Sequence, residues 1–61
     1  MEFYIIHTAD DTKRFHDFGV AVAYCMNMIG HGIEVWGSES PIQKAKLRLA
    51  KEVERNQGAY I

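Results

Sequence analysis

No side chain between Phe18 and Gly30 carries a charge, and this run takes up a large share of a chain of only 61 residues. Apolar residues recur through it at the spacing of one helix face: Phe18, Ala21, Val22, Cys25 and Ile29. The opposite face is also uncharged, with Val20, Ala23, Tyr24 and Asn27. The period predicts an α-helix, and a helix that is apolar nearly all round is normally covered on both sides. The rest of the chain, or another molecule, must therefore cover its second side.

Residues with strong capping preferences stand at both ends of this helix. The carboxylate of Asp17 is placed to accept from the first free amides, and Gly30 and Gly32 offer the left-handed backbone with which many helices end. We expect the helix to begin directly after Asp17. A competing interpretation starts it at Asp10 or Asp11, where the apolar period is poorer.

Three short segments have the composition of strands. Residues 2–8 are rich in aromatic and β-branched side chains, and the sequence ADD after them indicates a turn. Residues 12–16 then complete a predicted β-hairpin. Residues 33–36 predict a further strand, with Ile33 and Val35 on its core face.

The second helix has the clearest predicted start in the chain. Ser40 is the expected N-cap, Pro41 takes the first helical position, and Gln43 completes an S-x-x-Q capping box. An anion site at these helix-start amides is the alternative, and Glu39 brings unfavourable charge to it. The expected core face of this helix consists of Ile42, Ala45, Leu49 and Val53.

The end of the second helix sets the expected domain boundary. We expect the helix to run to about Asn56 and Gly58 to close it, so that 1–57 form one domain and 58–61 a short tail. The element order is then β-β-α-β-α. This order predicts a small α+β domain with a three-stranded sheet and two helices.

A helix layer on one side cannot cover both faces of the first strand. Because pairing enlarges a marginal core and twofold dimers are the commonest oligomers, we expect a homodimer. Its candidate interface combines the first strand with the back of the uncharged helix: Tyr4, Ile6, Val20, Ala23, Tyr24 and Asn27. The alternative is a compact monomer with a few exposed apolar side chains.

Few residues suggest catalysis or a bound cofactor. The paired spacing of metal ligands is missing among the natural candidates, His7, His16, His31 and Cys25. A turn explains the adjacent Asp10 and Asp11, and Cys25 lies on the core face of its helix. We therefore expect a non-enzymatic protein with no metal, no cofactor and no small-molecule substrate.

The same features indicate where the protein resides. A single cysteine favours a reducing compartment, and no apolar run approaches the roughly 18 residues of a membrane helix. We expect a cytoplasmic protein that does not contact a membrane. Chains this short without catalytic motifs are frequent among accessory proteins of phages and mobile elements, an expectation that rests on size alone.

Charge is divided unevenly along the chain. Residues 1–40 carry six acidic and two basic side chains, whereas residues 41–61 carry five basic and two acidic ones. At 100° per residue, four cations of the second helix fall within an arc of about 60°. Like charges four residues apart do not stabilise a helix, so we interpret this arc as a candidate partner surface, with a solvated face as the alternative. The candidate surface also includes Leu47 and Trp36, and its cations are Lys44, Arg48, Lys51 and Arg55.

These observations favour a small interaction module, of the adaptor or inhibitor type, that binds a protein not identified by the sequence. The alternative is a nucleic-acid-binding protein that uses the basic face of the second helix, with Tyr4 and Trp36 as stacking residues. A formal net charge of −1 is unfavourable for that alternative.

Overall fold

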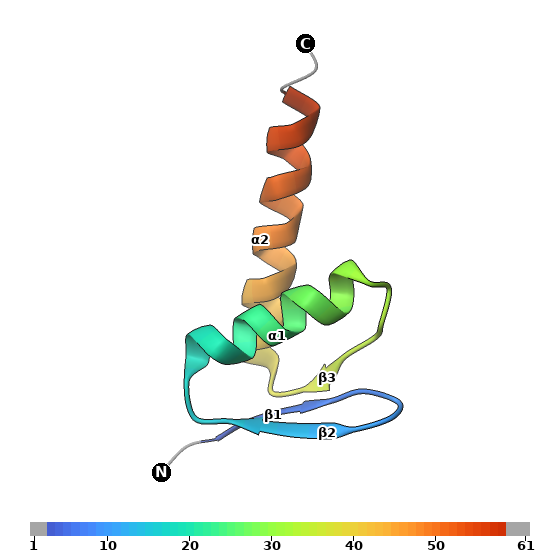
Figure 1. Ribbon diagram of the computed structural model, residues 1–61. Coiled ribbons are helices and arrows are strands. Elements are labelled where there is room, and N and C mark those ends of the chain that lie inside the picture. Colours follow the sequence, from blue (N-terminus) through green and yellow to red (C-terminus); the bar gives the residue numbers. More distant parts are fainter. Residues whose placement is uncertain (1–2, 59–61) are drawn as a thin grey trace.

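The structure, a computed structural model, describes the backbone of residues 3–58 and the side chains of residues 3–54. It confirms the element order β-β-α-β-α. The elements are β1 (Tyr4–His7), β2 (Thr12–Phe15), α1 (Phe18–Gly30), β3 (Trp36–Gly37) and α2 (Glu39–Gly58). The strands form one antiparallel sheet in the order β2-β1-β3, and both helices lie on the same side of it (Figure 1).

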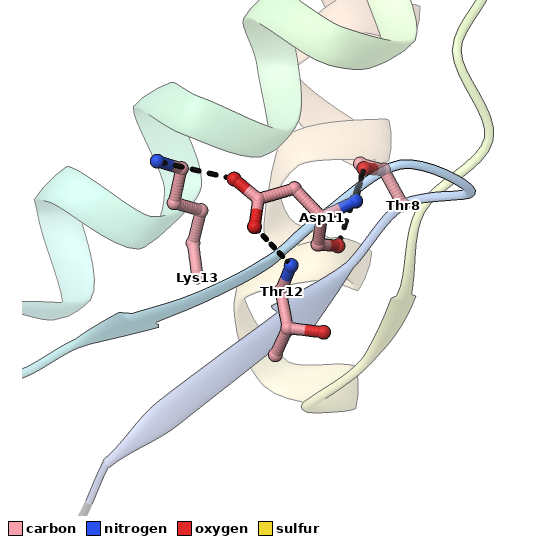
Figure 2. Close-up of polar contacts among 4 residues, drawn as sticks. All are labelled: Thr8, Asp11, Thr12 and Lys13. Carbon is pink, nitrogen blue, oxygen red and sulfur yellow. Dashed lines mark hydrogen bonds and ion pairs between the residues drawn. The ribbon is translucent and has the colours of Figure 1, made fainter.

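The hairpin between β1 and β2 is held by contacts around Asp11, which Figure 2 shows. The Thr8 amide donates to the Asp11 carbonyl at 2.8 Å, and the Asp11 carboxylate accepts from the Thr12 amide at 2.8 Å. The other carboxylate oxygen lies 3.2 Å from Lys13 Nζ. These contacts favour the charged form, so the pKa of Asp11 lies below its ordinary value, chiefly because of the Thr12 amide. The predicted hairpin is confirmed, and the alternative helix start at Asp10 or Asp11 is wrong.

Both ends of α1 are capped as the sequence predicts. Asp17 has extended backbone, and its carboxylate accepts from the Val20 amide at 3.1 Å. At the other end Gly32 takes a φ of +78°, while its amide donates to the Ile29 carbonyl. The Ile33 amide donates to the Met28 carbonyl at 2.9 Å, which completes a Schellman motif.

The third strand is shorter and later than predicted. It covers only Trp36 and Gly37 instead of 33–36. The Ile33 amide is engaged in the Schellman motif that follows α1, and its side chain is 41% exposed, so its predicted core role is wrong. Val35 does enter the core, as predicted.

The start of α2 also differs from the prediction. The helix begins at Glu39, so Ser40 lies inside its first turn and is not the N-cap residue. Ser38 precedes the helix instead, and its hydroxyl accepts a 2.8 Å hydrogen bond from the Ile5 amide of β1. The strand-to-helix junction therefore depends on a contact with the sheet, which no local capping pattern reveals.

The core lies between the sheet and the two helices. It consists of Ile6, Val22, Cys25, Val35, Ile42 and Ala45. The predicted core face of α2 is correct for its first turns only, because Leu49 is partly exposed and Val53 is 55% exposed. The backbone of α2 continues to Gly58, beyond the predicted end near Asn56, and residues 59–61 of the predicted tail lie outside the described residues.

The second half of α2 extends well beyond the rest of the fold (Figure 1). The molecule measures 46 × 24 × 14 Å, and its radius of gyration is 12.7 Å. A compact chain of this length has a radius of gyration of roughly 10.5 Å. The excess reflects the projecting segment, residues 50–58, of which every described side chain, from Ala50 to Glu54, is exposed.

Candidate functional site

The side of the sheet that faces away from both helices forms a second surface. Ile6 is fully buried in the core, so its neighbours Ile5 and His7 point to the opposite side. Their partners in the strand register, Arg14, Thr12 and Trp36, share that side. We call this surface the outer face: Phe3, Ile5, His7, Thr12, Arg14, His16 and Trp36.

Two aromatic pairs stand at the ends of the outer face. The His7 and Trp36 rings are stacked, with centroids 6.0 Å apart and an interplanar angle of 23°. The Phe3 and His16 rings lie 4.6 Å apart. Trp36 is 49% exposed and Phe3 is 46% exposed. The His7 ring also contacts β2, because its Nδ1 and the Thr12 hydroxyl share a hydrogen bond of 3.0 Å.

The outer face differs in charge from the other surfaces formed by residues 3–43. Residues 3–43 carry five acidic and two basic side chains, yet none of the acidic ones occupies the outer face. Arg14 lies there, directly across from Ile5 between the two aromatic pairs. Within the described residues Arg14 makes no ion pair, whereas its neighbour Lys13 pairs with Asp11.

The predicted partner surface is only partly brought together. Lys44, Leu47, Arg48 and Lys51 are all exposed along α2. Arg55 belongs to the same helix, and its side chain lies outside the described ones. Trp36 is separate from this group, because it lies on the outer face and α2 is on the other side of the sheet (Figure 1).

The predicted dimer interface is also divided by the fold. Ile6 is fully buried within this chain, so it cannot present a surface to a second copy. Tyr4 and Tyr24 are half-buried, in ring contact with Phe18 and Phe15 respectively. The exposed members are Val20, Ala23 and Asn27, which follow one another along α1.

Sequence reasoning missed most of the outer face. It grouped Tyr4 with Trp36 as stacking residues, but Tyr4 shares the core side of β1 with Ile6 and Trp36 lies opposite. The strand period contained a usable signal, because alternate residues of a hairpin share one side. Applied from Phe3 and continued across the turn to Arg14 and His16, it places most of this surface together.

The titratable residues considered for chemistry do not converge. Cys25 is fully buried, as predicted, and burial raises the pKa of its thiol. Within the part of the chain that the structure describes, no three His, Cys, Asp or Glu side chains are grouped so that they could hold a metal ion. Nor does any described helix have the length and apolar character needed to cross a membrane.

Comparison with known proteins adds no relative. No protein-family model matches the chain, and neither a curated protein nor a solved structure is significantly similar to it.

Proposed function

We propose that this chain is a non-enzymatic interaction module that inserts the second half of α2 into an apolar groove of a partner protein. The observation that carries this proposal is the exposure of apolar side chains on α2. Val53 is 55% exposed and Leu49 is only partly covered, whereas Leu47, which is 54% exposed, lies on the other side of the helix.

The position of these residues on the helix supports a groove-binding mode. Leu49 and Val53 are four residues apart and continue the stripe that Ile42 and Ala45 bury in the core. Most helices in proteins are stabilised by packing of such a stripe, and short helices alone in water are marginal. A partner that covers Leu49 and Val53 would supply the packing that the sheet and α1 give to the first turns of α2.

Charge indicates the kind of groove. Between Lys44 and Glu54 the helix carries four basic and two acidic side chains. Charges at the rim of an interface select partners more than they add affinity. The partner we propose therefore has an apolar groove with an acidic border on the side that Arg48 faces, about 100° around the helix from Leu49, while Lys51 lies on the far side of the helix and contributes through its longer-range charge.

We also propose that α1 pairs with α1 of a second copy. The exposed stripe Val20, Ala23 and Asn27 has no charge to desolvate, and the small side chain of Ala23 at its centre lets two helices approach closely there. Ala23→Glu would place like charges near a twofold axis and should convert a dimer into a monomer in sedimentation analysis. A wild-type mass that stays monomeric at every concentration would refute this pairing.

Site-specific crosslinking in the native host tests the docking of α2. A photoreactive side chain at position 53 should crosslink one host protein, whereas the same group at exposed position 10 should not. The captured protein is then purified, and its affinity is measured for the wild type, Leu49→Glu and the double variant Arg48→Glu with Lys51→Glu.

The expected result is a direct complex that both variants weaken at least tenfold while the variant proteins stay folded. Equal crosslinking at positions 10 and 53, or unchanged affinity of both variants, would contradict the proposal. Crosslinks from position 53 to nucleic acid would instead support the alternative in which the basic face of α2 binds phosphates.

A further inference from the structure

We infer that the outer face is a second binding site and that its ligand is single-stranded nucleic acid. This inference is independent of the proposed docking of α2, because the two surfaces lie on opposite sides of the sheet (Figure 1). It rests on the exposed rings, on the charge of the face and on the spacing between its aromatic pairs.

The exposed rings are large and held in place. Trp36 and Phe3 each leave nearly half of their surface open; Trp36 stacks on His7 of β1, and Phe3 contacts His16, which directly follows β2. Side chains on a sheet stand roughly perpendicular to it. The outer face therefore offers two ordered aromatic groups whose position is fixed before a ligand arrives.

The charge of the outer face favours an anionic ligand over a second copy of this chain. Among the side chains that the structure describes, its one permanent charge is the guanidinium of Arg14, and no carboxylate occupies the face. A twofold contact through this surface would bring two such cations together without an acidic residue of the face to compensate them. A ligand with regularly spaced negative charges meets no such penalty.

The arrangement of rings and cation fits a single strand. Phe3, which directly precedes β1, and His7 are four positions apart, which is about 13 Å at the rise of a strand. Arg14 lies between the two aromatic pairs, where it can contact a phosphate while bases stack at either end. Stacking on aromatic side chains is available to unpaired bases, and a duplex keeps the faces of its bases covered. An acidic peptide would meet the charge but would offer no rings to stack.

Trp36 provides a direct readout, because it is the only tryptophan in the chain. Short oligo(dT) and oligo(U) should quench its emission when a base stacks on the indole. Fluorescence anisotropy of labelled oligo(dT) gives the affinity of Trp36→Ala, Trp36→Phe and Arg14→Gln. The control variant, Arg48→Glu with Lys51→Glu on α2, leaves the outer face intact. Far-UV circular dichroism and thermal unfolding verify that each variant is folded.

We expect Trp36→Ala to weaken binding roughly 5- to 150-fold, the range for loss of one stacked base, and Trp36→Phe to retain most of it. Arg14→Gln should reduce the slope of log affinity against log salt by about 0.7, the value for one phosphate contact in a single strand. Arg14 is exposed, so this variant keeps the test valid even if Trp36→Ala does not fold.

Several results would overturn the inference. These are the absence of binding and of quenching at low ionic strength, equally tight binding of a duplex, and equal competition by polyglutamate, which would indicate an acidic protein ligand. Binding that is lost in the α2 control variant and kept in Trp36→Ala would assign the phosphates to α2 instead.

Discussion

Ile5 and Ser38 are joined by two hydrogen bonds across 33 positions of sequence. The Ser38 amide donates to the Ile5 carbonyl at 2.8 Å, as in an ordinary antiparallel pair. In return the Ile5 amide donates to the Ser38 hydroxyl, also at 2.8 Å, and not to the Ser38 carbonyl. The hydroxyl takes the role of the carbonyl because α2 begins at the next residue.

Replacement of this hydroxyl should destabilise the fold. Ser38→Ala leaves the partly buried Ile5 amide without its acceptor, which costs about 1–2 kcal/mol. For a domain of this size the unfolding temperature should fall by roughly 4–8 °C per kcal/mol. Ser40→Ala is the matched control, and calorimetry should show a change within about 0.5 kcal/mol. A larger loss for Ser40→Ala than for Ser38→Ala would mean that Ser40 caps the helix after all.

Two glycines should respond in opposite directions to the same substitution. Gly37 has a φ of +121°, and a Cβ there would collide with the Ile5 carbonyl oxygen. Gly37→Ala should therefore cost at least about 2 kcal/mol. Gly30 has ordinary helical backbone and open space where a Cβ would be placed, so Gly30→Ala should gain up to about 1 kcal/mol. Urea unfolding measures both, and equal effects would contradict the structure of β3.

Asp11 should contribute to the acid sensitivity of the fold. Its pKa in the folded chain lies below the ordinary value of 3.8, so the contribution is present above about pH 4 and is lost as the pH falls through the lowered pKa. The unfolding temperature of Asp11→Asn should therefore fall less steeply below pH 4 than that of the wild type. Asp10→Asn, at the exposed tip of the turn, should retain the wild-type slope. Parallel slopes for Asp11→Asn and the wild type would show that the Asp11 contacts do not persist in solution.

Cys25 should behave as a core residue and not as a reactive thiol. It is fully buried and its pKa is raised, so the native protein should react with a thiol reagent far more slowly than the protein in urea. Cys25→Ser places a hydroxyl in an apolar core and should cost about 1–3 kcal/mol. Modification at equal rates in both states would place the thiol at the surface.

The sequence predicts those parts of the fold that depend on local pattern. The period from Phe18 onward and the carboxylate of Asp17 define α1 because both signals act within one or two turns. The start of α2 was misplaced because Ser38 is fixed by a strand that lies far away in sequence. The apolar period also assigned Val53 to the core, since a period identifies a face of a helix without showing whether anything lies against it.

The same difference between local patterns and contacts distant in sequence applies to the candidate surfaces. The cations of α2 are recognised from helical spacing alone, and the structure finds the described ones exposed. The outer face requires the strand register, which depends on the length of the Thr8–Asp11 turn and on the late position of β3. A shift of one residue in the turn would have moved Arg14 to the opposite side, and a shift of one residue in β3 would have moved Trp36.

The two-residue strand β3 also has a consequence for the order of folding. The hairpin and α1 involve neighbours in sequence and can form early, whereas β3 joins positions about thirty residues apart, and we expect it to pair only once α1 lies on the sheet. Closing such a loop costs conformational entropy before its contacts contribute any stabilisation. We predict that the Ser38 contacts form after the rate-limiting step, in which case Ser38→Ala should mainly accelerate unfolding and leave the refolding rate nearly unchanged, whereas slower refolding would place them at or before that step.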